Sequence, residues 1–152
     1  AIYQAFSGNF CEYDEELLRS REKETIDRIA VVNVKKSNGE NGSDYEDLKT
    51  YAEEDKAELK QELEIIRPEI IVCGNNLSLL KIVLGEELQN EYTWDTMFAW
   101  WNDTLVIDYY HPAVHYPNRV NYYALMSICD VARKARKIAK DIQEKQEKLP
   151  GS

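Results

Sequence analysis

Cysteine is scarce in this sequence, with 3 residues among 152 and no pair at CxxC spacing. A disulfide framework or a zinc–thiolate site needs more cysteines in closer pairs, so the sequence argues against both and predicts a reducing, cytoplasmic location. Glycine and proline are also few, with 6 and 4 residues, which excludes a low-complexity chain. No uninterrupted apolar run exceeds a few residues, so we expect neither a membrane span nor a membrane partner.

Positive charge is in deficit, since the formal net charge is −9. This balance argues against a protein that coats nucleic acid generally. The distribution is uneven, because residues 111–152 carry 8 basic and 4 acidic residues. A local anionic partner is therefore possible in the last quarter of the chain.

The apolar patterning predicts an α/β protein with a three-layer architecture, in which helices flank a parallel sheet. The length suits a single domain, residues 1–152. Short β-branched runs predict strands at 29–34, 69–73 and 104–109, and helical spacing predicts helices at 13–28, 43–66 and 77–88. A long C-terminal helix follows, with one apolar face made of Val120, Ala124, Ile128, Val131, Ala135, Ile138 and Ile142.

In parallel sheets, functional residues lie at the carboxyl ends of the strands. The candidate site residues are therefore expected in 33–38, 74–76 and 110–121. Asn33 interrupts an apolar strand, and its carboxamide either satisfies neighbouring backbone or reads a planar ligand such as a pyrimidine edge. His111 follows the third strand, and it either caps the loop or donates a hydrogen bond to a developing oxyanion. His115, on the same loop, is expected to be exposed to solvent.

Basic and aromatic side chains near these ends have two interpretations each. Lys35 and Lys36 are either solvated or contact phosphate, and the same holds for Arg119 near the start of the last helix. The aromatic cluster Trp94, Trp100 and Trp101 favours core or interface packing over base stacking. No glycine-rich phosphate loop or metal-ligand spacing stands out, so we expect no cofactor and no metal.

Three segments, in order, resemble motifs of the uracil-DNA glycosylase superfamily. Residues 29–36 (IAVVNVKK) resemble the strand that carries its uracil-reading asparagine. Residues 67–74 (RPEIIVCG) resemble a second strand that ends in glycine. Residues 106–121 (VIDYYHPAVHYPNRVN) resemble the last active-site motif, most closely the form found in the single-strand-selective branch.

The resemblance implies hydrolysis of the N-glycosidic bond of a flipped uracil or related base in DNA. Asn33 would bond the uracil edge and reject cytosine, and His111 would stabilise the departing uracil anion. Further substrate contacts are implied for Gly74, Asn75 and Tyr110. The implied DNA contacts are Lys35, Lys36, Pro112, Ala113, His115, Arg119 and Asn121.

The sequence departs from this superfamily in two places. Ala113 stands where a serine is usual, and the early strand with the loop that handles the attacking water is absent before Asn33. We therefore consider three hypotheses. The chain is the C-terminal part of a larger glycosylase-like domain whose first, central strand comes from a separate N-terminal segment or protein partner. Alternatively, it is a relative that lost catalysis and binds nucleic acid, a nucleotide or a protein, or it is an unrelated α/β interaction domain.

Overall fold

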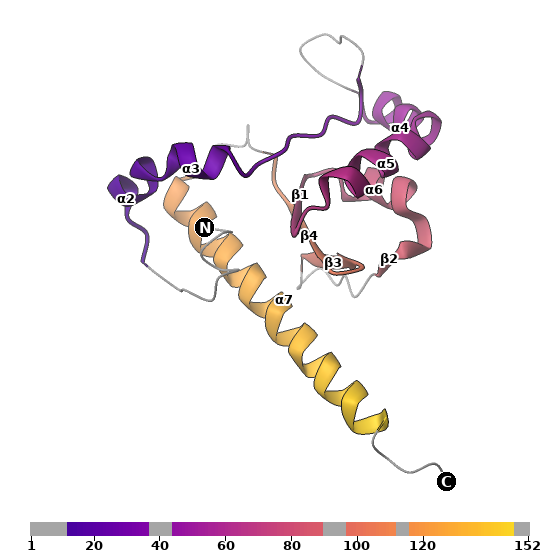
Figure 1. Ribbon diagram of the computed structural model, residues 1–152. Coiled ribbons are helices and arrows are strands. Elements are labelled where there is room, and N and C mark those ends of the chain that lie inside the picture. The colour runs from indigo at the N-terminus through magenta and orange to yellow at the C-terminus, as the bar shows by residue number, and fades with distance from the viewer. Residues whose placement is uncertain (1–11, 37–43, 90–96, 112–115, 148–152) are drawn as a thin grey trace. The chain divides into compact units, whose positions relative to one another are not determined.

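A computed structural model describes residues 12–36, 44–89, 97–111 and 116–147 (Figure 1). The chain divides into two compact units. One contains residues 14–92 and 97–114, and the other contains residues 1–13, 93–96 and 115–152. The first unit holds the sheet and the second holds the long C-terminal helix.

The sheet has four strands in the order β1-β4-β3-β2. The predicted strands near 69–73 and 104–109 are confirmed as β1 (Ile70–Gly74) and β4 (Thr104–Tyr109), and they pair in parallel. β3 (Phe98–Trp101) and β2 (Leu88–Gln89) add antiparallel pairs. The sheet is therefore mixed, and the predicted parallel pairing is confirmed for β1 and β4 alone among the described strands. Only Asn102 and Asp103 separate β3 from β4, and so short a connection joins antiparallel strands alone.

β3 was not predicted as a strand, although it contains Trp100 and Trp101 of the aromatic cluster. Trp101 is buried in the core with Ala99, whereas Phe98 lies on the opposite side of the strand and is buried as well. Core packing is thus the observed role of Trp101. Trp94 lies outside the described residues.

Residues 29–36 do not form the predicted strand. They join no strand of the described sheet, and the chain bends at Val34. Val32 and Val34 pack against the hydrophobic core, whereas Val31 is 82% exposed. The alternation of a half-buried strand is present here, but the backbone has no neighbouring strand with which to exchange hydrogen bonds.

Three helices pack beside the sheet in the first unit. The predicted helix at 43–66 is confirmed as two helices, α4 (Tyr45–Glu54) and α5 (Lys56–Ile66), which meet at Asp55. The predicted helix at 77–88 is α6 (Leu77–Leu84), followed by the short 3₁₀ turn η1 (Gly85–Glu87). Their shared core with the sheet includes Ala52, Leu59, Leu63, Cys73, Leu79, Val83, Ala99, Trp101 and Val106.

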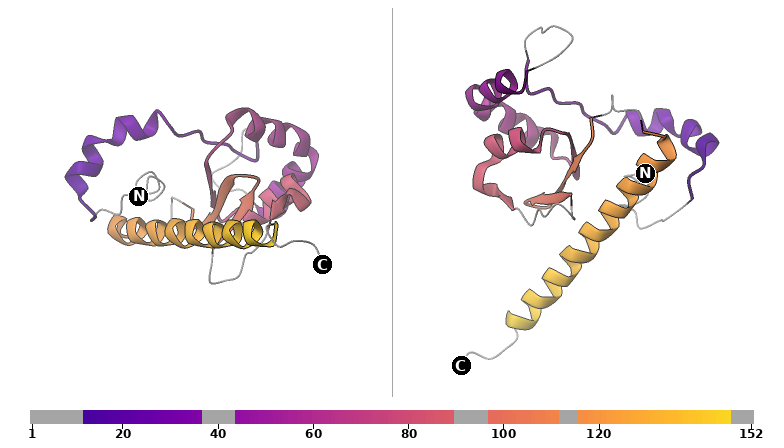
Figure 2. Two further views of the ribbon diagram at one scale, coloured as in Figure 1. Left: turned by 60° about the horizontal axis from the view of Figure 1, so that its bottom comes forward. Right: turned by 180° about the vertical axis from the view of Figure 1, so that it is seen from behind.

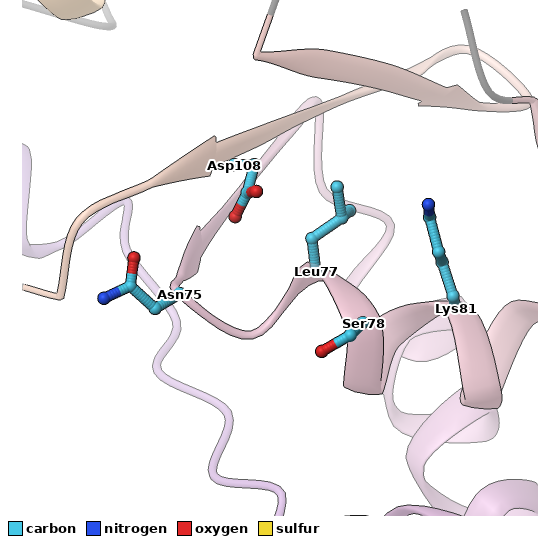
Figure 3. A pocket seen from close by; sticks show the side chains of 5 residues that line it. All are labelled: Asn75, Leu77, Ser78, Lys81 and Asp108. Carbon is cyan, nitrogen blue, oxygen red and sulfur yellow. The ribbon is translucent and has the colours of Figure 1, made fainter. Parts of the chain in front are cut away.

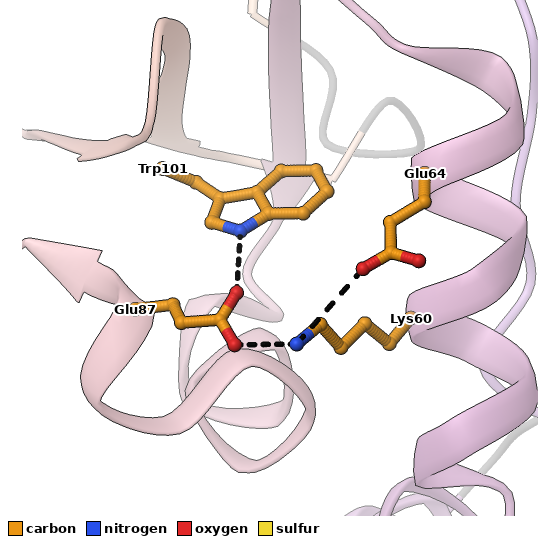
Figure 4. Close-up of polar contacts among 4 residues, drawn as sticks. All are labelled: Lys60, Glu64, Glu87 and Trp101. Atoms are coloured by element: carbon orange, nitrogen blue, oxygen red, sulfur yellow. Dashed lines mark hydrogen bonds and ion pairs between the residues drawn. The ribbon is translucent and has the colours of Figure 1, made fainter.

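A polar cluster joins α5 to η1 and β3 at the edge of this core (Figure 4). The carboxylate of Glu87 accepts hydrogen bonds from the Lys60 ammonium group and, at 3.3 Å, from the Trp101 indole nitrogen. These two donors lower the pKa of the Glu87 carboxyl group. Glu87 thus gives the indole N–H of the buried Trp101 side chain a hydrogen-bond partner, so the cluster supports the packing of the core.

The remaining helices lie outside this core. The helix predicted at 13–28 is split into α2 (Glu15–Ser20) and α3 (Glu22–Ile26), neither of which has a buried residue. The predicted C-terminal helix is confirmed as α7 (Asn118–Glu147), a single uninterrupted helix (Figure 2). In the parts of the chain that the structure describes, no helix combines the length and apolar content that crossing a bilayer requires.

The predicted apolar face of α7 is not the face that the structure buries. The buried residues are Tyr122, Met126, Cys129 and Ala132, whereas Val120, Val131 and Ile138 are exposed. Successive helical residues are rotated by about 100°, so these two groups lie on opposite sides of the helix. The sequence carries two apolar stripes, and tertiary structure selected the other one.

Candidate functional site

A pocket of about 260 Å³ opens where β1 and β4 end and α6 begins. It is lined by Asn75, Leu77, Ser78, Lys81 and Asp108 (Figure 3). Asn75 follows β1, Asp108 belongs to β4, and the other three residues belong to α6. The lining therefore combines a carboxylate, an ammonium group, a carboxamide and a hydroxyl with one leucine.

The parallel pairing of β1 and β4 creates this pocket. Cys73 is paired with Asp108 and Gly74 with Tyr109, so both strands end at the same level. The next residue, Asn75, has φ 60, a left-handed conformation that asparagine tolerates better than most residues. Its backbone N–H donates to the carbonyl oxygen of Tyr109 across 2.8 Å, and this hydrogen bond holds the ends of β1 and β4 together.

Asp108 reaches the pocket from the helix-facing side of the sheet. Side chains alternate along a strand, and Asp108 shares its face with Val106, which is buried in the core under the helices. The backbone N–H of Asp108 donates to the carbonyl oxygen of Met97 across 2.9 Å. Because β4 pairs with β1 on one side and β3 on the other, hydrogen bonds on both sides hold the backbone that carries this carboxylate.

The first turn of α6 forms the opposite wall. The Tyr45 hydroxyl donates to the Ser78 hydroxyl oxygen at 2.9 Å and ties α4 to this turn. The backbone N–H groups of Leu79 and Leu80 donate to the carbonyl oxygen of Asn76 at 3.1 Å. Leu77 and Leu79 are buried, so the core itself holds the start of the helix in place.

Several predicted site residues gather at this edge of the sheet. Gly74 ends β1, while Tyr110 and His111 directly follow β4 and are exposed. The rings of Tyr109 and Tyr110 meet edge to face with centroids 5.4 Å apart. Of the residues predicted for substrate binding, Asn75 alone lines the pocket.

Asn33 and the two lysines occupy different surroundings. Asn33 is exposed and is not among the lining residues of this pocket. The Lys35 ammonium group lies 2.6 Å from the carboxylate of Asp47, and that of Lys36 lies 2.5 Å from the carboxylate of Glu62. The hydrogen bond to Asp47 raises the pKa of Lys35. A phosphate group must compete with these carboxylates for both lysines.

The remaining predicted DNA contacts fall elsewhere. Arg119 and Asn121 lie in the first turns of α7, in the second unit. The Arg119 guanidinium group lies 5.9 Å from the ring centroid of Tyr123, and the Asn121 amide donates to the Tyr116 carbonyl oxygen at 3.5 Å. Pro112, Ala113 and His115 lie outside the described residues.

Comparisons with protein-family models, with curated proteins and with solved structures found no match. Within the described residues, no group of three or more histidine, cysteine, aspartate or glutamate side chains is placed to hold a metal ion.

Sequence reasoning missed Asp108, Ser78 and Lys81. The signal for Asp108 was present, because it is the one charged residue in the otherwise apolar and aromatic end of β4 (TLVIDY). A carboxylate near the carboxyl end of a buried strand has to reach either solvent or a polar pocket. Ser78 and Lys81 carried no such signal, since both are ordinary residues for an amphipathic helix.

Proposed function

We propose that this chain is a uracil-DNA glycosylase-like protein that hydrolyses the N-glycosidic bond of a flipped uracil, or a related base, in DNA. One observation carries the proposal. The parallel β1–β4 pair brings together the ends of two of the three resembling segments, with Asn75 in the lining of a polar pocket and His111 two residues beyond the end of the adjacent strand. Ligand sites of α/β sheets lie at this edge.

The chemistry of the pocket edge suits a base that leaves as an anion. In the proposed reaction, His111 donates a hydrogen bond to the oxygen on which negative charge develops, which stabilises the transition state. The Asn75 carboxamide offers a donor and an acceptor to the edge of the base. Asn75 takes the reading role that the resemblance implies for Asn33, because Asn75 lines the pocket and Asn33 does not.

Asp108 supplies the remaining chemical group that hydrolysis requires. Water must be oriented and must lose a proton as it attacks the sugar carbon, and a positioned carboxylate is a suitable base. Asp108 is the only carboxylate among the residues that line the pocket. We assign it the role of the acidic loop that this sequence lacks before Asn33.

The proposed fold is the three-layer arrangement of that superfamily without its first, central strand. The position of β1 supports this part of the proposal. β1 stands at the end of the strand order, and no described strand pairs with its outer edge. An added strand there would separate β1 from residues 29–36, as the superfamily resemblance implies.

A second candidate function is base or nucleotide binding without hydrolysis. The ion pairs of Lys35 with Asp47 and of Lys36 with Glu62 favour it, because they weaken the contacts to phosphate that a DNA enzyme needs. The net charge of −9 also opposes association with DNA. Such a protein would retain the pocket and bind free uracil without cleaving DNA.

The deciding experiment measures abasic sites formed in a single-stranded oligonucleotide that contains one uracil. The wild-type chain is compared with the His111→Ala, Asp108→Asn and Glu69→Gln variants. Glu69 is an exposed carboxylate beside the opposite end of β1 and serves as the matched control. We expect abasic product from wild type and control, and a loss of roughly 100-fold or more for His111→Ala, as removal of one oxyanion donor produces.

Two results separate the candidate functions. Abasic product that depends on His111 and Asp108 supports the hydrolase. Saturable binding of free uracil with no abasic product, lost in Asn75→Ala, supports the binding protein instead. Absence of both product and binding in a folded sample contradicts both.

A further inference from the structure

Lys81 lines the pocket but has no part in the proposed hydrolysis. It lies on the second turn of α6, four residues after Leu77, and its side chain is half-buried. Leu77, Val83 and Leu84 of the same helix are buried in the core, so the backbone that carries Lys81 is held in place. The pocket therefore contains an amine whose position depends on the packing of α6.

Asp108 lines the same pocket from the sheet. Lys81 and Asp108 reach the pocket from α6 and β4, on either side of Leu77 in Figure 3. The hydroxyl of Ser78 belongs to the same lining, and because it accepts the hydrogen bond of Tyr45 at 2.9 Å, its own O–H remains a donor. An amine, a carboxylate and a hydroxyl donor thus line one pocket.

These three groups suit a substrate that carries an aldehyde. A lysine amine adds to the aldehyde carbon and forms an imine, which draws electrons away from the neighbouring carbon. A positioned carboxylate then removes a proton from that carbon. A deoxyribose that has lost its base opens to an aldehyde and a hydroxyl, so the same sugar also offers an acceptor to the Ser78 hydroxyl.

We propose that Lys81 forms a covalent imine with the aldehyde of an abasic site, and that Asp108 then brings about cleavage of the DNA strand by β-elimination. The choice of substrate rests on the proposed function, because an abasic site is the product of that hydrolysis. The inference adds a second activity, in which the same pocket cuts the strand at the position that has lost its base.

The reaction runs through an imine and returns the enzyme unchanged. The neutral amine of Lys81 adds to the aldehyde carbon, and water leaves as the protonated imine forms. The carboxylate of Asp108 removes a proton from the adjacent carbon. The electron pair of that bond expels the phosphate group from the following carbon, which breaks one carbon–oxygen bond of the strand. Water then hydrolyses the imine, which releases Lys81 and leaves an unsaturated aldehyde, so neither an oxidant nor a reductant is required.

Borohydride trapping tests the covalent step in the full chain. The substrate is a single-stranded oligonucleotide with one preformed abasic site, so the assay needs no excision of uracil. Borohydride reduces the imine to a stable amine, and peptide mass spectrometry identifies the lysine that carries the oligonucleotide. The matched control is Lys56→Gln, which changes an exposed lysine of α5 that does not line the pocket. We expect the adduct on Lys81, its loss in Lys81→Gln and its retention in the control.

Strand cleavage tests the role of Asp108. In Asp108→Asn the imine should still be trapped at Lys81, whereas cleavage of the abasic strand should slow by about 100-fold or more, as loss of a general base produces. A purely structural effect of this substitution would lower trapping and cleavage together, and that result would overturn the role of Asp108.

The covalent step fails if wild type gives no adduct, if Lys81→Gln keeps it, or if the adduct spreads over exposed lysines. Failure of the proposed function is measured separately, as absence of abasic product from the uracil oligonucleotide. Wild type that excises uracil but traps no abasic strand would contradict this inference alone. Wild type that traps the abasic strand at Lys81 but excises no uracil would support the imine and contradict the proposed hydrolysis.

Discussion

Cys73 and Asp108 are paired residues of the parallel strands β1 and β4. Cys73 is buried, and burial together with the nearby charge of Asp108 raises the pKa of its thiol to about 12. The thiolate is the reactive form of cysteine, so this pairing makes Cys73 inert despite its place beside the pocket. The sulfur atom is therefore a packing group of the core.

Alkylation of Cys73 should be slow while the protein is folded. A rise of the thiol pKa from 9.0 to about 12 lowers the thiolate fraction at pH 8 by roughly 1000-fold. Iodoacetamide labelling followed by peptide mass spectrometry measures the rate at this one residue, with the urea-unfolded chain as reference. Equal rates in the folded and unfolded chains would refute the assignment.

The stability of the protein should fall at alkaline pH. Above pH 9 the unfolded thiol of Cys73 loses its proton, whereas the folded thiol keeps it until about pH 12. Deprotonation thus favours the unfolded state, and each pH unit in this window lowers the free energy of unfolding by about 1.4 kcal/mol. Urea titrations between pH 8 and 10.5 measure this slope. The slope should become flatter in Cys73→Ala, and an unchanged slope would argue against Cys73 as its source.

Release of Lys35 and Lys36 from their ion pairs should create a DNA-binding surface. The Asp47→Asn, Glu62→Gln variant removes both carboxylate partners. We expect it to bind a single-stranded oligonucleotide more tightly, with a salt dependence steeper by about 0.7 per lysine that reaches a phosphate. Fluorescence anisotropy at several salt concentrations gives the slope.

The control for that experiment is Glu46→Gln with Glu58→Gln. Both residues are exposed on the same two helices, and this variant changes the net charge equally. If the control variant gained the same affinity for the oligonucleotide, net charge rather than the two released lysines would drive binding.

The turn between β3 and β4 should prefer glycine or asparagine at position 102. Asn102 has φ 52, in the left-handed region, where a residue with a Cβ and no local hydrogen bonding is strained. Asn102→Ala should destabilise the protein by about 1 kcal/mol, whereas Asn102→Gly should change stability by less than about 0.5 kcal/mol. Thermal unfolding compares the two, and equal stability of both variants would contradict this account.

Local sequence predicted those helices and strands whose residues all favour the same type of secondary structure. The runs around Ile71 and Val106 are apolar and β-branched, and both are strands because each can pair with the other. Phe98 to Trp101 also form a strand, which their aromatic residues and the two-residue spacing before Thr104 both favour. Residues 29–34 have equally good strand composition, but no ladder forms there.

The sequence by itself determined the α/β character, the strands β1 and β4, and the carboxyl edge at which Asn75 and His111 stand. Only the tertiary structure decided that Asp108 lines the pocket, that Lys35 and Lys36 are engaged by Asp47 and Glu62, and which side of α7 is buried. The physical reason is the range of the interactions. Side-chain periodicity is a local property, whereas strand pairing, ion pairs between distant residues and the choice between two apolar faces depend on which segments meet in space.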